Sequence, residues 1–176
     1  MVAIFWAVEG IESITAIDLD QWGIYPRTIR GLIGIFSSPF LHGNLNHLVS
    51  NSAIFILLGG SILYFFPKKG KEIFLLIYLI TGFGVWLFAR PAYHIGASGL
   101  IYGFAAMLFF SGIFRNELKY LVLSLILAIF YNSMLYGIFP SDPNVSWESH
   151  LIGTIVGGGV AFYFRKSGAG NTQLTD

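Results

Sequence analysis

Long apolar runs separated by short polar stretches are the main feature of this chain, and they predict helices that cross a membrane. A spanning helix needs roughly 20 predominantly apolar residues. Runs that approach this length each end at charged residues, glycine or proline. We expect spans at about residues 46–66, 72–88, 98–114, 120–139 and 149–164.

The N-terminal apolar run, residues 1–8, ends at Glu9 and is too short to cross a bilayer. It lacks the basic start and small-residue cleavage site of a signal peptide. We interpret it as the remnant of a first helix that has lost its N-terminal half by truncation. Residues 9–45 then form a loop on the outer side, and the polar tail 167–176 is predicted to be disordered.

Composition supports a membrane domain and excludes several other classes. The 176 residues are 55% hydrophobic and 11% charged, whereas a soluble domain carries about 25% charged residues. The net charge of +1, without a basic stripe, gives no case for a nucleic-acid partner. With no cysteine, disulfides and a cysteine nucleophile are excluded. The sequence therefore predicts one all-α, six-helix domain over residues 1–166, with the lipid bilayer as its surroundings.

Lysine and arginine are distributed unevenly between the two sides of these spans. Cytoplasmic loops of membrane proteins are enriched in both residues. The loops after residues 66, 114 and 164 carry Lys68, Lys69, Lys71, Arg115, Lys119, Arg165 and Lys166. The opposite side has fewer cations and most of the acidic residues. We therefore place the C-terminus in the cytoplasm, and the starts of spans 46–66, 98–114 and 149–164 at the outer face.

Polar side chains occur in the first turns of these three spans. They are His47 and Asn51, then Ser98, then His150. Each has a purely structural reading: Ser98 as a helix N-cap, His150 as an interfacial histidine, and His47 with Asn51 as interhelical hydrogen bonds. Their coincidence at one depth weakens these readings, because polar residues in spans usually face a wet cavity or the bundle interior.

Glycine pairs follow Ser98 and His150 at matching spacing. Gly99 and Gly103 lie in one span, and Gly153 and Gly157 in the other. Small residues four apart let helix backbones approach closely. A serine–histidine hydrogen bond of about 2.6–3.2 Å requires such an approach.

Together these residues predict nucleophilic catalysis by a Ser–His dyad. Neutral His150 would take the Ser98 proton and later deliver it to the leaving amine. No carboxylate lies inside the spans except near their ends, so Tyr102, one turn below Ser98, would orient the imidazole. His47 and Asn51 would stabilise the oxyanion, together with the backbone N–H of Ser98.

Metal catalysis is the main chemical alternative, and the histidines do not favour it. There are four histidines but no H-E-x-x-H motif. No intramembrane carboxylate is available as a ligand or base. We therefore expect no metal and no other cofactor.

Four segments give the chain its resemblance to the rhomboid family of intramembrane serine proteases. The resemblance covers about residues 25–166. The segments are Phe40-Leu-His-Gly-Asn44, His47-Leu-Val-Ser-Asn51, Gly96-Ala-Ser-Gly-Leu-Ile-Tyr-Gly103 and His150-Leu-Ile-Gly153 with Gly157. It implies a six-helix core, Ser98 as nucleophile, His150 as base, and His47 and Asn51 as oxyanion donors.

The resemblance also implies where substrate enters. A water-filled cavity would open to the outside, the loop 140–148 would cap it, and the span 120–139 would gate sideways access. Substrates would be single-pass membrane proteins with a helix-weakening stretch, and the location would be a bacterial cell (inner) membrane. A catalytically silent relative that escorts membrane clients is the first alternative, and a transporter or channel is the second. The natural substrate and the oligomeric state stay open.

Overall fold

The computed structural model describes residues 1–130, 136–140 and 142–166, and these residues are predominantly helical. Within these ranges the only β-type pairing is a bridge between Ile24 and His94. The helices, with two short 3-10 turns, are α1 (Val2–Thr15), η1 (Asp20–Trp22), α2 (Ile29–Ser37), η2 (Ser38–Phe40), α3 (Leu45–Phe65), α4 (Gly70–Phe88), α5 (Ser98–Arg115), α6 (Leu118–Phe130) and α8 (Trp147–Tyr163).

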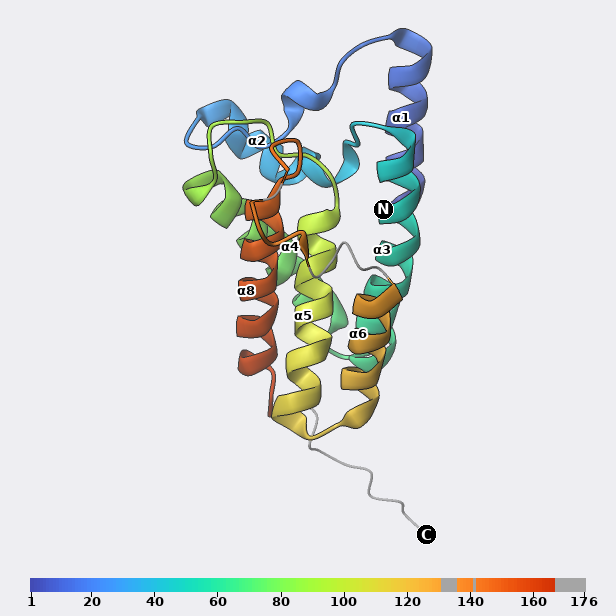
Figure 1. Ribbon diagram of the computed structural model, residues 1–176, viewed down its shortest axis with the longest axis vertical. Helices are drawn as coiled ribbons and strands as arrows, with labels where there is room; N and C mark the ends of the chain where they lie inside the picture. Colours follow the sequence, from blue (N-terminus) through green and yellow to red (C-terminus); the bar gives the residue numbers. More distant parts are fainter. Residues whose placement is uncertain (131–135, 141, 167–176) are drawn as a thin grey trace.

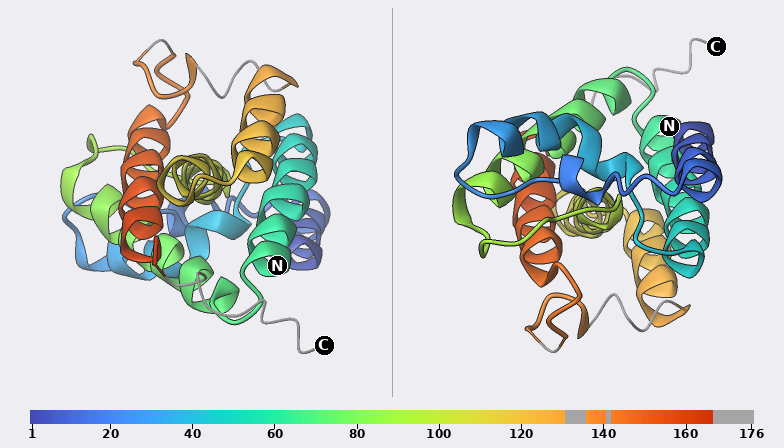
Figure 2. Two further views of the ribbon diagram at one scale, coloured as in Figure 1. Left: turned by 90° about the horizontal axis from the view of Figure 1, so that it is seen from below. Right: turned by 90° about the horizontal axis from the view of Figure 1, so that it is seen from above.

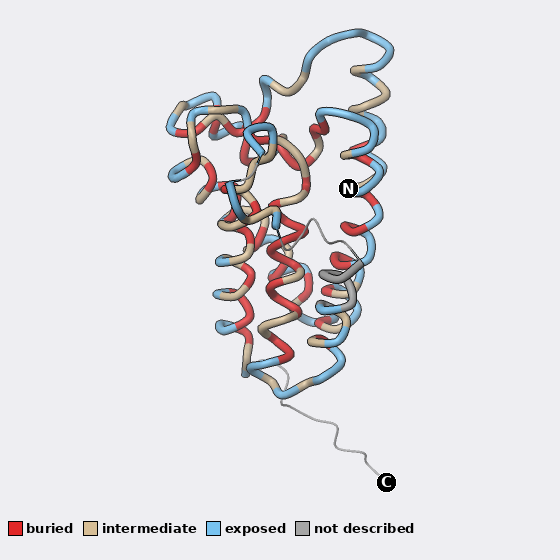
Figure 3. Tube along the Cα trace, in the orientation of Figure 1, coloured by how far each residue is buried: buried red, intermediate tan, exposed pale blue. Residues whose placement is uncertain are grey.

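Helix α5 lies at the centre of the bundle. It contacts α3, α4, α6 and α8, and the two end-on views show it surrounded by them (Figure 2). Its side chains are correspondingly buried, as the burial-coloured trace shows (Figure 3). Phe104, Met107 and Leu108 have no exposed surface. The helix that begins with Ser98 is therefore held on every side by other helices.

Three of the described helices, α3, α4 and α5, are long and apolar enough to cross a bilayer. Large apolar side chains on the outer faces of the bundle, such as Ile56, Tyr64 and Phe88, remain exposed. Such a surface suits lipid rather than water. The prediction of an all-α membrane bundle is therefore confirmed, and α3, α5 and α8 all begin toward the upper end of the molecule (Figure 1).

The first helix is longer than its apolar run. Helix α1 continues through residues 9–15, which the hydropathy pattern assigns to the outer loop, and ends where Ala16 adopts a left-handed conformation with φ 54°. Its Phe5 is fully buried, and the indole N–H of Trp6 donates to Ser52 Oγ at 3.2 Å. The apolar run ends at the first charged residue, Glu9. The backbone hydrogen bonds of the helix continue past it, because they do not depend on whether a side chain is apolar.

Helix α2 lies within residues 9–45, which the sequence assigns to the outer loop, and it packs against α4. The Arg27 guanidinium donates to the carbonyls of Leu87 and Ala89 at 3.1 and 3.0 Å. The Trp86 indole donates to the Thr28 carbonyl at 2.8 Å. These bonds fix the loop before α2 to the end of α4.

Two predicted segments lie partly or wholly outside the described residues. The predicted span 120–139 begins as α6, whereas residues 131–135 are not described. The tail 167–176 is not described either. The other spans agree with α3, α4, α5 and α8 to within about two residues at each end.

Candidate active site

Ser98 and His150 meet at the upper ends of α5 and α8. Ser98 is the first residue of α5, and His150 lies in the first turn of α8. His150 Nε2 lies 2.8 Å from Ser98 Oγ. The two polar residues that the sequence places at similar depth are thus in direct hydrogen-bonding contact.

A backbone carbonyl determines which nitrogen of His150 faces Ser98. His150 Nδ1 lies 2.8 Å from the Gly137 carbonyl oxygen. Because a carbonyl can only accept, Nδ1 carries the proton in the neutral ring and Nε2 accepts from the Ser98 hydroxyl. This is the tautomer that a general base needs. Sequence reasoning missed Gly137, because a backbone oxygen in a loop has no side-chain signature.

Tyr102 supports the imidazole from the next turn of α5. The two rings are stacked with their centroids 4.2 Å apart and an angle of 8° between their planes. The sequence predicts that Tyr102 orients the imidazole, and in the structure the two rings are stacked. The ring of His150 is therefore held at its face by Tyr102 and at its edge by Gly137.

The glycine pairs account for the closeness of the dyad. A methyl group at Gly153 would overlap the carbonyl oxygen of Gly99, and one at Gly157 would overlap that of Gly103. At Gly103 the added carbon would lie 3.3 Å from the Gly153 oxygen. The contact between α5 and α8 is thus backbone against backbone.

Helix α3 provides the opposite side of the site. Asn44 caps the helix by accepting from the His47 N–H at 2.9 Å. The imidazole and the Asn51 amide both point toward Gly96: a carbon added there would lie 3.0 Å from His47 Nε2 and 3.4 Å from Asn51 Nδ2. Gly96 has φ 98°, a left-handed conformation that favours glycine.

Asn51 carries a buried donor that none of the described residues pairs with. Its Nδ2 is buried and has no hydrogen-bond acceptor in the part of the chain that the structure describes. A buried amide N–H without a partner is costly, by about 1–3 kcal/mol. Such a donor suits a group that develops negative charge only during a reaction.

His42 lies behind His47, away from the cavity. The residue is 3% exposed, and its ring lies between Phe5 and His47, with centroid distances of 5.1 Å to each. Burial, and next the neighbouring His47, lower the pKa of His42 to about 4, although a backbone interaction with Phe40 opposes this. The ring is therefore neutral at pH 7.

A cavity of about 910 Å³ joins these groups. Residues 142–146 of the predicted cap loop form part of its wall. The polar side chains that line it include those of Ser98, His150, His47, Asn51, Tyr102, Arg90, His94 and Ser146. All five predicted site residues therefore face one space.

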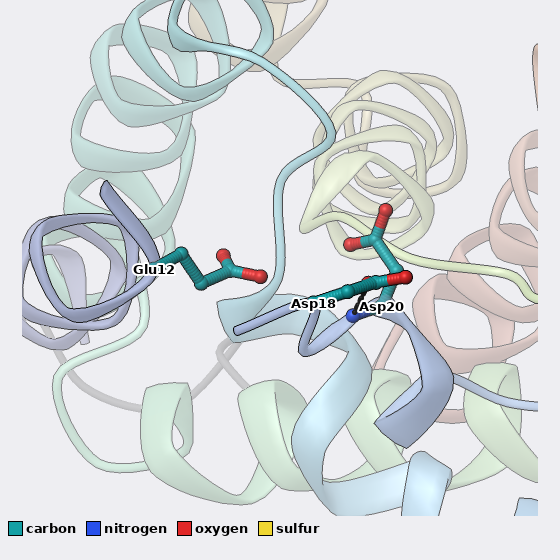
Figure 4. A group of neighbouring side chains, drawn as sticks. All are labelled: Glu12, Asp18 and Asp20. Carbon is teal, nitrogen blue, oxygen red and sulfur yellow. Dashed lines mark hydrogen bonds between the residues drawn. The ribbon is translucent and has the colours of Figure 1, made fainter. Parts of the chain in front are cut away.

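An acidic group lies where α1 ends and the segment toward α2 begins. Glu12, Asp18 and Asp20 each place a carboxylate oxygen within 4.8 Å of the others (Figure 4). Glu12 Oε1 accepts from the Leu19 N–H at 2.8 Å, and Asp18 Oδ1 accepts from the Asp20 N–H at 2.9 Å. Burial, followed by the neighbouring carboxylates, raises the pKa of Asp20. These carboxylates organise the loop, and none of the four histidines belongs to the group.

Comparisons with known proteins agree with this architecture. The family model for the Rhomboid domain matches residues 30–167. The uncharacterized protein Rv1337 of Mycobacterium tuberculosis (strain ATCC 25618 / H37Rv) is 33% identical over 169 residues, which cover 89% of this chain and 69% of that protein. The uncharacterized protein ML1171 of Mycobacterium leprae (strain TN) is 31% identical over 165 residues, covering 89% of this chain and 65% of that protein.

Proposed function

Because the chain belongs to the rhomboid family, a family of intramembrane serine proteases, we propose that it is a serine endopeptidase acting on membrane proteins. The observation that carries the proposal is the contact between Ser98 Oγ and His150 Nε2 at 2.8 Å, with Nδ1 held by the Gly137 carbonyl. Serine needs an adjacent base to become a nucleophile.

The reaction can be written with the residues of this chain alone. Ser98 Oγ attacks the scissile carbonyl carbon while His150 Nε2 takes the hydroxyl proton. The oxygen of the tetrahedral intermediate then accepts hydrogen bonds from His47, Asn51 and the Ser98 backbone N–H. When the C–N bond breaks, His150 returns its proton to the leaving amine.

Water completes the cycle. It attacks the Ser98 ester, His150 accepts its proton, and the carboxylic acid product leaves as Ser98 regains its hydrogen. The cavity of about 910 Å³ is large enough to admit water to the ester. Gly137 stabilises the charged imidazole through its carbonyl oxygen, which replaces the carboxylate of a catalytic triad.

Single-pass membrane proteins are the proposed substrates. The site lies near the upper ends of membrane helices rather than at their middle (Figure 1), so a substrate segment must be unwound near the bilayer surface to reach it. A helix-weakening stretch beside the scissile bond would permit this. The distribution of lysine and arginine supports an orientation with the site toward the outside and the C-terminus in the cytoplasm. A bacterial cell (inner) membrane is the proposed location.

Cleavage of a model single-pass substrate by the purified protein in liposomes tests the proposal. We expect Ser98→Ala and His150→Ala each to lower turnover by at least about 10³-fold, and a fluorophosphonate probe to label the parent protein but not Ser98→Ala. Ser61→Ala is the matched control, because its hydroxyl donates to the Leu57 carbonyl within α3. Undiminished cleavage by Ser98→Ala would contradict the proposal. Client binding without cleavage or labelling would favour a silent relative.

A further inference from the structure

The loops that precede the nucleophile and the base are joined by side chains that the proposed reaction does not use. Arg90 lies in the loop between α4 and α5. Its guanidinium donates to the carbonyls of Pro143 and Val145 at 2.7 and 2.8 Å, and its Nε lies 3.5 Å from Glu148 Oε1. One side chain of the first loop thus contacts three points on the segment that leads into α8.

His94 makes a second connection between the same loops. It is 2% exposed, with Nε2 3.0 Å from the Arg90 carbonyl and Nδ1 2.5 Å from Ser146 Oγ. Because the carbonyl can only accept, Nε2 carries the proton and Nδ1 accepts from Ser146. Ser146 Oγ lies 2.5 Å from Ser149 Oγ, so Ser149 donates to Ser146. This chain of bonds ends one residue before His150.

The backbone of His94 is itself anchored. Its N–H donates to the Ile24 carbonyl at 2.9 Å, and its carbonyl accepts from the Ile24 N–H at 3.0 Å. Two residues later, the Gly96 N–H donates to the Ser38 carbonyl at 2.8 Å. The loop between α4 and α5 is therefore held in place by the segment before α3. Bonds from this loop can in turn hold the loop that leads into α8.

Glu148 carries the charge that Arg90 balances. Its side chain is only 8% exposed, and its Oε2 has no hydrogen-bond partner within the described ranges. It lies in the first turn of α8, where the helix dipole favours a negative charge. The Arg90 side chain is partly exposed, so the buried member of the pair is Glu148. Removing Arg90 leaves that buried charge uncompensated, which is more disruptive than removing both charges.

We propose that Arg90, His94 and Glu148 form a clamp between the two loops, and that they are positioning residues that set His150 relative to Ser98. The clamp rests on the proposed function, since it acts through the dyad. The glycine contacts fix α5 against α8 along their length, whereas the clamp fixes the first turn of α8, which carries the base. Arg90 and His94 also line the cavity, so direct contact with substrate is the rival role.

Kinetics of a double-mutant cycle distinguish these roles. We expect Arg90→Gln to lower kcat by about 10²-fold, the loss typical of a catalytic group displaced by about 1 Å, while KM changes by less than about 2-fold. Glu148→Gln should lose less, and the double variant should recover activity relative to Arg90→Gln alone because no buried charge is left unpaired. Probe labelling of Ser98 should follow kcat.

Conservative replacement of His94 gives a second, independent readout. His94→Gln keeps a donor and an acceptor and should retain activity within about 3-fold, whereas His94→Leu should lose about 10-fold in kcat. If Arg90→Gln fails to fold in detergent, this pair decides the matter. Glu72→Gln is the matched control, because it breaks an exposed ion pair with Lys69 at 2.7 Å, far from the site, and should leave kcat unchanged.

The clamp would be overturned by wild-type kcat in Arg90→Gln, by losses confined to KM, or by effects in the double variant that simply multiply. Ser98→Ala belongs in the same series. Cleavage by Ser98→Ala would refute the proposed function itself, whereas an inactive Ser98→Ala beside fully active clamp variants would refute the clamp alone.

Discussion

The two walls of the cavity are built in different ways. On the α8 wall, glycines bring two backbones into contact, and a methyl group at Gly153 would overlap a carbonyl oxygen. On the α3 wall, the side chains of His47 and Asn51 lie beside Gly96 in a loop, and a carbon added there would meet side-chain atoms rather than backbone. The dyad thus depends on helix backbones, and the oxyanion donors depend on side-chain rotamers and one loop.

This difference predicts unequal sensitivity to substitution. Backbone-to-backbone contacts cannot adjust to an added atom without moving a whole helix. Side chains can rotate, and several donors share the stabilisation of one oxyanion. We therefore expect abrupt losses on the α8 wall and graded losses on the α3 wall.

Gly153→Ala tests the α8 wall and should have the largest effect. The new methyl group must push α8 from α5 and lengthen the contact between Ser98 and His150. We expect cleavage to fall below detection, by more than about 10²-fold, measured by turnover and by probe labelling. Gly159→Ala is the control on the same helix, because a carbon there meets nothing within 4 Å. If Gly153→Ala keeps activity within a few-fold of Gly159→Ala, the α8 wall is not more sensitive to substitution than the α3 wall.

Asn51→Ala tests the α3 wall. It deletes the buried Nδ2 that has no partner among the described residues, and one lost oxyanion donor typically lowers kcat by about 10²–10³-fold. His47→Ala should lower it to a similar or smaller degree, and neither should erase turnover in a folded protein. Complete loss in either variant, with unchanged thermal unfolding, would mean that the donors do not share the oxyanion.

Gly96→Ala should have a smaller effect on the same wall. Alanine at φ 98° is strained, by about 1–3 kcal/mol, and its methyl group would lie 2.8 Å from His47 Cε1. His47 can rotate away, so we expect a fall in kcat of about 10-fold rather than a total loss. Gly60→Ala on α3, where a carbon meets nothing within 4 Å, is the control. Activity equal to this control would show that His47 has no fixed position.

The residues of the α8 wall can be predicted from the sequence, whereas the loop residues that support His150 cannot. Ser98, His150 and the two glycine pairs are recognisable because helix periodicity and span direction together place them at one depth and one interface. Gly137 is not recognisable, because its contribution is a carbonyl oxygen in a loop. The Arg90–Glu148 pair is not predictable for another reason. The charges of loops indicate the orientation of a membrane protein, but which charges pair depends on how segments distant in the sequence pack together.

The structure also corrects the reading of the outer segment. An apolar run measures the part of a helix that lies in lipid, and helix α1 continues past Glu9 to Thr15. The length of a helix above the membrane has no hydropathy signal. The contact of Phe5 with His42 is not predictable from the sequence, because it depends on how α1 packs against the segment before α3.

The smallest expected effect concerns His42, which packs against His47. It is an effect on the free energy of unfolding rather than on kcat. Burial and the neighbouring His47 lower the pKa of His42 from 6.5 to about 4. The unfolded chain therefore binds a proton in a pH range where the folded protein does not. The stabilisation is fully present above pH 6.5 and is lost as the pH falls toward 4.

His42→Phe should remove this acid sensitivity while it preserves the aromatic packing between Phe5 and His47. We expect the parent protein to lose about 1–2 kcal/mol more than the variant between pH 7.5 and pH 5, measured as thermal unfolding in detergent at both values. The difference should vanish above pH 7, where His42 is neutral in both states. Equal acid destabilisation of the two proteins would mean that His42 is not buried behind His47.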